Sequence, residues 1–247
     1  MKVAVRIKKL LGLAHPLHAA DETPALAALL ESARWEHDVF HEVAAIVRTI
    51  DLAGFARVRD RHKDASPDPG YSKYLDLGRY LTLQIRYARR LRLAPADAPR
   101  NVLDIGTGAG YFPYVCTHYG HRAMAIDLDA NPMFNDMVHL LGVERVVHRV
   151  TPFTPLPPFP VRFDLVTAMQ MKFDTRPEGG PWGVDEWSFF LTDLAQNVAH
   201  PEAQVFLGFN ANAAGEVMPR DVERFLRQKG ARIRSSVVDL RSLDAFL

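Results

Sequence analysis

Apolar residues recur every three or four positions through the first hundred residues, which is the period of an amphipathic helix. One stripe of apolar positions runs from Leu26 to Ile50, and a second runs from Tyr74 to Leu91. Gly54 and the turn-rich segment Asp60–Gly70 lie between the stripes, so we expect the first helix to break at Gly54. The pattern predicts a helical cap over residues 1–98.

After residue 100 the pattern changes to short apolar strands that alternate with helical stretches. The expected strands are Val102–Ile105, Ala123–Leu128, Val146–Val150, Phe163–Met169, Val205–Phe209 and Ala231–Val238. The main expected helices are Asn131–Leu141, Val184–Val198 and Arg220–Gly230. This alternation is typical of a mostly parallel sheet covered on both faces. We therefore predict an α/β fold, a doubly wound, Rossmann-like sheet in residues 99–247, preceded by the helical cap.

Composition narrows the class of partners. The 247 residues carry 30 Lys and Arg against 29 Asp and Glu, so no overall charge attracts nucleic acid, and we expect none as a partner. A single cysteine and the absence of a Cys/His zinc pattern predict no disulfide and no zinc site. No apolar run is long enough to span a membrane, so we expect a cytoplasmic protein.

The basic and apolar start of the chain, Met1–Leu13, leaves two interpretations open. It is either a short surface element that packs on the cap or a weak interfacial membrane anchor. Its longest apolar run is shorter than the core of a secretory signal, so we do not expect it to be one.

The segment NVLDIGTGAGYFP, residues 101–113, is the most informative in the chain. It takes an expected strand into three glycines at alternate positions, Gly106, Gly108 and Gly110, and then into a helix. Glycines at such a turn let the backbone approach a ligand closely. Asp127 ends the next expected strand, where an acid accepts hydrogen bonds from ribose hydroxyls in nucleotide-binding sheets. The spacing predicts a nucleotide site, but not the G-x-G-x-x-G dinucleotide fingerprint.

The form D-x-G-x-G-x-G, followed by AIDLD, resembles motif I and the next motif of class I S-adenosylmethionine-dependent methyltransferases. The resemblance covers roughly residues 101–238 and implies S-adenosylmethionine as the cofactor. It implies that the Gly106–Gly110 loop passes under the methionine part of the cofactor and that Asp127 binds the ribose diol. It also implies that Asp104 supports either the loop or the cofactor's amino group.

Further cofactor contacts are expected next to these motifs. They are assigned to Thr107, Tyr111, Leu128, Phe153 and Met169. Phe153 enters as a candidate for the adenine ring because no acid follows the third expected strand, where many members of the family carry one. The family's final antiparallel strand is also poorly supported, since only nine residues follow the sixth expected strand.

Methyl transfer is an in-line displacement, so alignment of the two reactants supplies most of the catalysis, whereas a hydroxyl acceptor also needs a base. The candidates for catalysis are Asp174, Tyr71 and His148. Met169 stands where metal-dependent relatives carry a ligand, so we expect no metal. The predicted acceptor is a small molecule or a glycan or lipid-linked hydroxyl. A non-catalytic scaffold with the same fold is the alternative, and a homodimer stays open.

Overall fold

The computed structural model describes residues 39–63, 72–93, 98–174, 179–210 and 217–247. Tyr71, the segment Met1–Leu13 and the first apolar stripe up to residue 38 lie outside these residues. Seven strands form one sheet in the order β3-β2-β1-β4-β5-β7-β6. The first five pair in parallel, and β7 runs antiparallel to both of its neighbours. The predicted doubly wound, mostly parallel α/β fold is confirmed.

The strands lie close to the predicted positions. They are β1 Asn101–Ile105, β2 Arg122–Asp127, β3 Arg145–Val147, β4 Phe163–Met171, β5 Ala199–Phe209, β6 Arg232–Arg234 and β7 Val237–Leu240. The third strand is shorter than predicted and ends before His148. The helices are α3 Phe40–Val47, α4 Leu52–His62, α5 Leu77–Arg90, α6 Tyr111–His118, α7 Pro132–Leu140, α8 Val184–Asp193 and α9 Arg220–Gln228. Short turns of other helix types are Ser72–Leu75, Leu194–Val198 and Asp244–Phe246.

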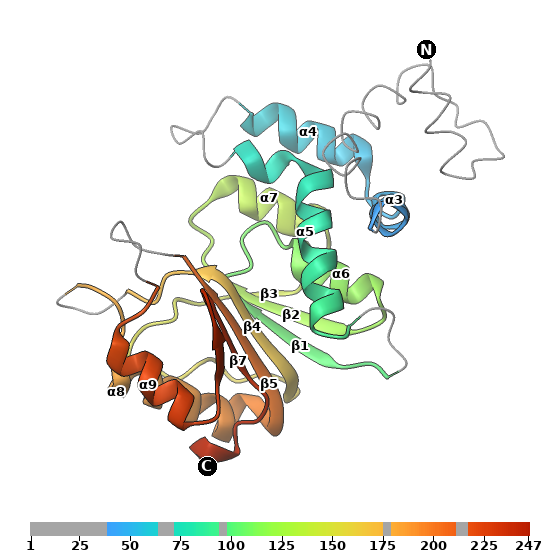
Figure 1. The fold of residues 1–247 in the computed structure, drawn as a ribbon. Helices are drawn as coiled ribbons and strands as arrows, with labels where there is room; N and C mark the ends of the chain where they lie inside the picture. Colours follow the sequence, from blue (N-terminus) through green and yellow to red (C-terminus); the bar gives the residue numbers. More distant parts are fainter. Residues whose placement is uncertain (1–38, 64–71, 94–97, 175–178, 211–216) are drawn as a thin grey trace.

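Helices cover the sheet on both faces, as Figure 1 shows: α5, α6 and α7 lie over one face, and α8 and α9 over the other. Successive strand residues point to opposite faces. Val102 therefore joins the core under α5 and α6, whereas its neighbour Leu103 joins the core under α8. The helices before residue 98 share the first of these cores with the sheet, so the described part of the cap is packed directly onto it.

Polar contacts also attach the cap to the sheet's own helices. The Asp136 carboxylate on α7 accepts from Arg61 and His62 of α4, at 2.6 and 2.8 Å. The hydrogen bond with His62, supported by Arg61, lowers the pKa of Asp136. On the other side, Glu42 of α3 bonds both Arg89 of α5 and Tyr119, which follows α6. These contacts attach α4 to α7, and α3 to α5 and the end of α6.

The predicted sixth strand, Ala231–Val238, is wrong in one respect, because it is two strands. Ser235 has a positive φ of 52° and lies in a tight turn between β6 and β7. The turn reverses the chain, so β7 pairs antiparallel with β5. The final antiparallel strand, which the sequence supports poorly, is therefore present.

The predicted helix break at Gly54 is also wrong. Gly54 lies inside α4, and its N–H donates to the capping carboxylate of Asp51 at 2.9 Å. A Cβ at residue 54 would lie 2.6 Å from Cδ1 of Leu140 on α7 and 2.5 Å from Oδ2 of Asp51. The glycine is needed for the close approach of α4 to α7.

We predict that Gly54→Ala destabilises the protein, although alanine favours helix by about 1 kcal/mol. The clash with Leu140 should cost about 1–3 kcal/mol, as overpacking does in other cores, so a net loss is expected in urea denaturation. Ala53→Gly is the control: it changes the helix propensity at the exposed neighbouring position, where there is no contact with Leu140. A Gly54→Ala protein more stable than wild type would show that the approach of α4 to α7 does not constrain residue 54.

Candidate functional site

The glycine loop after β1 has a backbone that only glycine adopts readily. Gly106, Gly108 and Gly110 have φ values of 73°, 57° and 79°. A Cβ on Gly106 would lie 2.0 Å from Sδ of Met171, so a side chain at this residue would have to displace that of Met171. A Cβ on Gly108 would instead enter the space toward the Phe134 ring, 3.6 Å away. The loop therefore presents bare backbone to that space.

Asp127, at the end of β2, holds the loop in this shape. Its Oδ2 accepts from the Gly108 N–H at 2.6 Å, and its Oδ1 accepts from the Leu128 N–H at 2.7 Å. Each carboxylate oxygen has a further lone pair with which it can accept a hydrogen bond from a ligand. Strand order places β1 beside both β2 and β4, where the direction of winding reverses. In open α/β sheets, ligands bind at that switch point.

Asp104 lies inside β1, beneath the loop. Its side chain is buried, and Oδ1 accepts from the Thr167 hydroxyl of β4 at 2.7 Å. Burial raises the pKa of Asp104 to about 7, although the hydrogen bond from Thr167 opposes the shift. The carboxyl group therefore changes charge near neutral pH, in a position where a bound cation would favour the ionised form.

Aromatic rings from the cap and α7 enclose the space above the loop. The Tyr74 ring lies 4.7 Å from that of Tyr80 and 5.0 Å from that of Phe134. Tyr80 also stacks on Tyr111, whose hydroxyl donates to the Tyr74 carbonyl at 2.7 Å. Burial raises the pKa of Tyr80 to about 12, so its hydroxyl is neutral at physiological pH. Aromatic faces attract cationic ligands.

Together these groups line a cavity of about 310 Å³, which we call the loop cavity. Its size lies within the range of small-molecule sites. The predicted cofactor residues that line it are Asp104, Gly106, Thr107, Gly108, Tyr111, Asp127 and Met169. Lining residues outside the predicted set include Tyr74, Tyr80, Gln84, Tyr87, Phe134, Gln170 and Met171. Tyr80 and Tyr87 belong to α5 and Tyr74 to the turn before it, and aromatic residues in such a helical segment are equally typical of a buried core.

Other predicted residues lie outside the lining of the loop cavity. Gly110 and Leu128 adjoin it in the chain but do not line it. Phe153 is 56% exposed, and its ring lies beside that of Phe189 on α8. His148 follows β3, where its backbone N–H donates to the Asp127 carbonyl at 3.1 Å and its Nε2 is buried without a partner among the described atoms. The structure does not bring Phe153 or His148 to the glycine loop's cavity.

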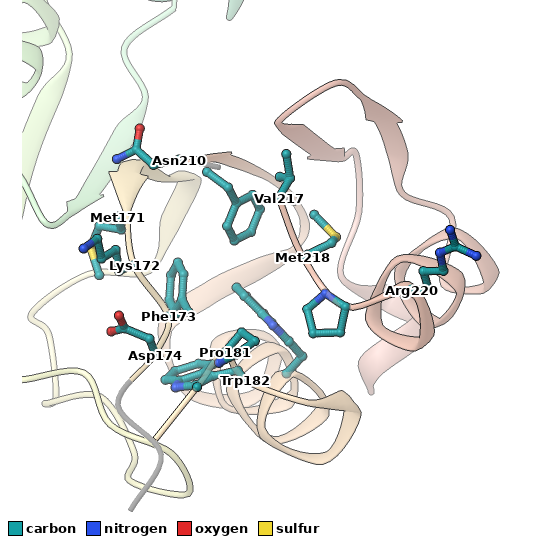
Figure 2. Close-up of a pocket in the computed structure, with 14 residues that line it drawn as sticks. Met171, Lys172, Phe173, Asp174, Pro181, Trp182, Asn210, Val217, Met218 and Arg220 are labelled. Atoms are coloured by element: carbon teal, nitrogen blue, oxygen red, sulfur yellow. The ribbon is translucent and has the colours of Figure 1, made fainter. Parts of the chain in front are cut away.

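A second cavity of about 630 Å³ adjoins the first and shares Met171 with it; we call it the aromatic pocket. Figure 2 shows it at the ends of β4 and β5, with Phe173 and Trp182 at its base and Asp174 at its edge. Phe173, Trp182 and Trp187 are buried, with ring centroids 4.6 to 5.3 Å apart. Asp174 is the only one of the three predicted catalytic residues that lines a described cavity.

The end of β4 is irregular where the two cavities meet. Gln170 has a positive φ of 60°, and the pairing of β4 with β5 shifts register between Met169 and Met171. The Asn210 amide, just after β5, donates to the Gln170 carbonyl at 3.0 Å and supports this bulge. Bulges re-aim side chains next to binding sites. Here Met169 and Met171 both line the loop cavity, and Met171 also reaches the aromatic pocket.

The residues that the structure describes contain neither a cluster suited to a metal ion nor a helix suited to a membrane crossing. No group of three or more His, Cys, Asp or Glu side chains in that part of the chain is placed to hold a metal ion. No helix there combines the length and apolar character that a membrane crossing requires.

No protein-family model matches the chain, and no curated protein is significantly similar to it in sequence. Solved structures do resemble it at low identity. The amino pentose methyltransferase CalS10 of Micromonospora echinaspora is 22% identical over 62% of this chain and 61% of its own, with a TM-score of 0.42. A SAM-dependent methyltransferase from Archaeoglobus fulgidus is 15% identical over 62% and 69%, with a TM-score of 0.41.

DesVI of Streptomyces venezuelae is 15% identical over 55% of this chain, with a TM-score of 0.39. The match spans about half of that protein, 52% of its length. The assignment of the fold rests on the strand order and pairing described above.

We predict that Asp104 makes stability fall as pH rises from about 4 to 7. The folded state, with its raised pKa, binds the proton over a range in which the unfolded chain has lost it, so the stabilisation is lost as pH approaches 7. Asp104→Asn should flatten this decline in urea denaturation, because an amide does not titrate. The variant should still fold, since the amide oxygen can accept from Thr167. Asp129→Asn, at an exposed acid, is the control. Parallel pH curves for wild type and Asp104→Asn would contradict the prediction.

Proposed function

We propose that this chain binds S-adenosylmethionine in the loop cavity and transfers its methyl group to a hydroxyl of a small-molecule acceptor, without a metal. One observation carries the proposal: at the switch point of the sheet, a glycine loop is tied to an acid at the end of β2, under an aromatic wall. These are the requirements of a nucleoside ligand with a cationic centre.

The residues present fit that cofactor. Asp127 has lone pairs for a ribose diol, and the Gly108 backbone allows close approach of the ligand. Tyr74, Tyr80 and Phe134 offer ring faces to a sulfonium, and Asp104 offers a carboxyl that ionises near neutral pH. When bound, the cofactor supplies an electrophilic methyl group on a positively charged sulfur.

The protein's own contribution is to align the acceptor and to exclude water. The acceptor oxygen forms a bond to the methyl carbon as the carbon–sulfur bond breaks, and the hydroxyl proton passes to a base. We assign that base to Asp174, since it lines the pocket that adjoins the loop cavity. Tyr71 and His148 remain predictions without a described place in either cavity.

A non-catalytic, cofactor-binding scaffold is the second candidate function. One observation favours it: no histidine is among the described residues that line either cavity. Histidine is the commonest general base, and a scaffold would need none. The two functions differ in turnover, whereas both require the cofactor to bind.

We predict that Asp127→Ala weakens S-adenosylmethionine binding by about 1–3 kcal/mol, or about 5- to 150-fold, in calorimetric titration. The variant removes the acceptor both for the ribose and for the Gly108 N–H. Asp129→Ala is the matched control, because it deletes an exposed acid two residues further along, outside the cavity lining. Equal affinity of Asp127→Ala and wild type would refute the proposed site.

Activity is tested with a radiolabelled methyl group on the cofactor and a fractionated extract as the source of acceptor. Label in a small-molecule fraction, lost in Gly108→Val, is the result expected of the enzyme. Binding without label in any fraction would favour the scaffold.

A further inference from the structure

The aromatic pocket has walls whose chemistry differs from that of the loop cavity. Of the fourteen described residues that line it, nine are apolar, and they are Met171, Phe173, Pro181, Trp182, Trp187, Phe209, Val217, Met218 and Pro219. Such walls contribute mainly by removing apolar ligand surface from water.

The base of the pocket is preformed in the described structure. Phe173 is 6% exposed, and its ring lies within 6 Å of those of Trp182, Trp187 and Phe209. The Phe173 carbonyl also accepts from the Trp182 N–H at 2.8 Å, which ties the end of β4 to the segment before α8. Rings packed in this way are held rigidly, and aromatic rings in the lining of a pocket can pair with a flat ligand.

Polar side chains in the pocket are concentrated on one side. Figure 2 shows Lys172, Asp174 and Asn210 along the β4 side, whereas Arg220 lies on the opposite side, at the start of α9. Met171, which the loop cavity shares, lies on the β4 side as well. Three of the four polar side chains in the described lining are thus on the side of Met171, and Arg220 is the exception.

We infer that the aromatic pocket takes a flat, largely apolar acceptor with its single reactive hydroxyl at the polar edge beside Met171. The inference rests on the proposed function and names the substrate class for it. A pyranose carries hydroxyls around the rim of its ring, and those that meet the apolar walls would lose their hydrogen bonds to water without replacement. A phenol-like molecule places its one polar group at the edge and buries the rest.

In this arrangement Asp174 and Asn210 have different tasks. Asp174 is the carboxylate at the edge and takes the hydroxyl proton, while the acceptor oxygen forms its bond to the methyl carbon and the carbon–sulfur bond breaks. Asn210 is a positioning residue: its hydrogen bond to the Gln170 carbonyl supports the bulge that sets Met171 between the two cavities.

The test is calorimetry on the full chain with 2-naphthol, a flat apolar hydroxyl compound, and with methyl β-glucoside. We expect 2-naphthol to bind and the glucoside not to bind at the same concentration. Met218→Glu and Val217→Glu, which place a charge in the apolar wall, should each weaken 2-naphthol binding by about tenfold or more. Both should leave the affinity for S-adenosylmethionine unchanged. Leu247→Glu, at an exposed apolar residue outside the pocket, is the control and should change neither affinity.

Two results would overturn the inference while leaving the proposed function intact: unchanged 2-naphthol affinity in both pocket variants, or glucoside binding that those variants abolish. If wild type does not bind S-adenosylmethionine, the proposed function is refuted. The aromatic pocket then has no role as an acceptor site, even if it binds 2-naphthol. Methyl transfer to 2-naphthol that is lost in Met218→Glu, with cofactor affinity retained, would support both.

Discussion

The hydrogen bond from the Gly108 N–H to the Asp127 carboxylate is the contact on which the candidate site depends. It joins the loop after β1 to the end of β2, two segments that parallel pairing has already brought to the same edge of the sheet. With the loop held there, its left-handed glycines turn their backbone toward Phe134 and the cap. The same carboxylate is the acceptor that the proposed function assigns to a ribose, so under that proposal one side chain both shapes the loop and binds the ligand.

The glycine loop and Asp127 could be predicted because their chemistry is local: alternate glycines directly after a strand, and an acid directly after the next. The residues of α5 that line the loop cavity could not be predicted in this way. Tyr80 and Tyr87 lie in a helical segment, and periodicity alone does not distinguish a ring that fills a core from one that lines a cavity. The helix break predicted at Gly54 was wrong for a related reason. A glycine that breaks a helix and one that allows a neighbouring helix to pack closely cannot be distinguished in the sequence.

The general place of the aromatic pocket, in the segments after the fourth and fifth strands, follows from the rule that ligands lie beyond the carboxyl ends of parallel strands, but its shape could not be predicted. Its residues come from the ends of β4 and β5 and the segments that lead into α8 and α9, and only tertiary structure brings them together. Met171 was predicted to follow the fourth strand, but the strand continues through it. The positive φ of Gln170, in a residue type that rarely adopts it, gives no signal in the sequence. The bulge depends on Asn210, forty residues away along the chain.

Asp104 and Met171 both line the loop cavity, and each has a different effect on it. A carboxyl group buried beneath the loop costs stability as it ionises. Met171, in contrast, occupies the space over Gly106 at the junction with the aromatic pocket, and a thioether is flexible enough to move aside. Asp104 ionises near neutral pH beneath aromatic rings that attract cations, and Met171 is a flexible side chain between the two cavities. This combination suits a site that brings two ligands together.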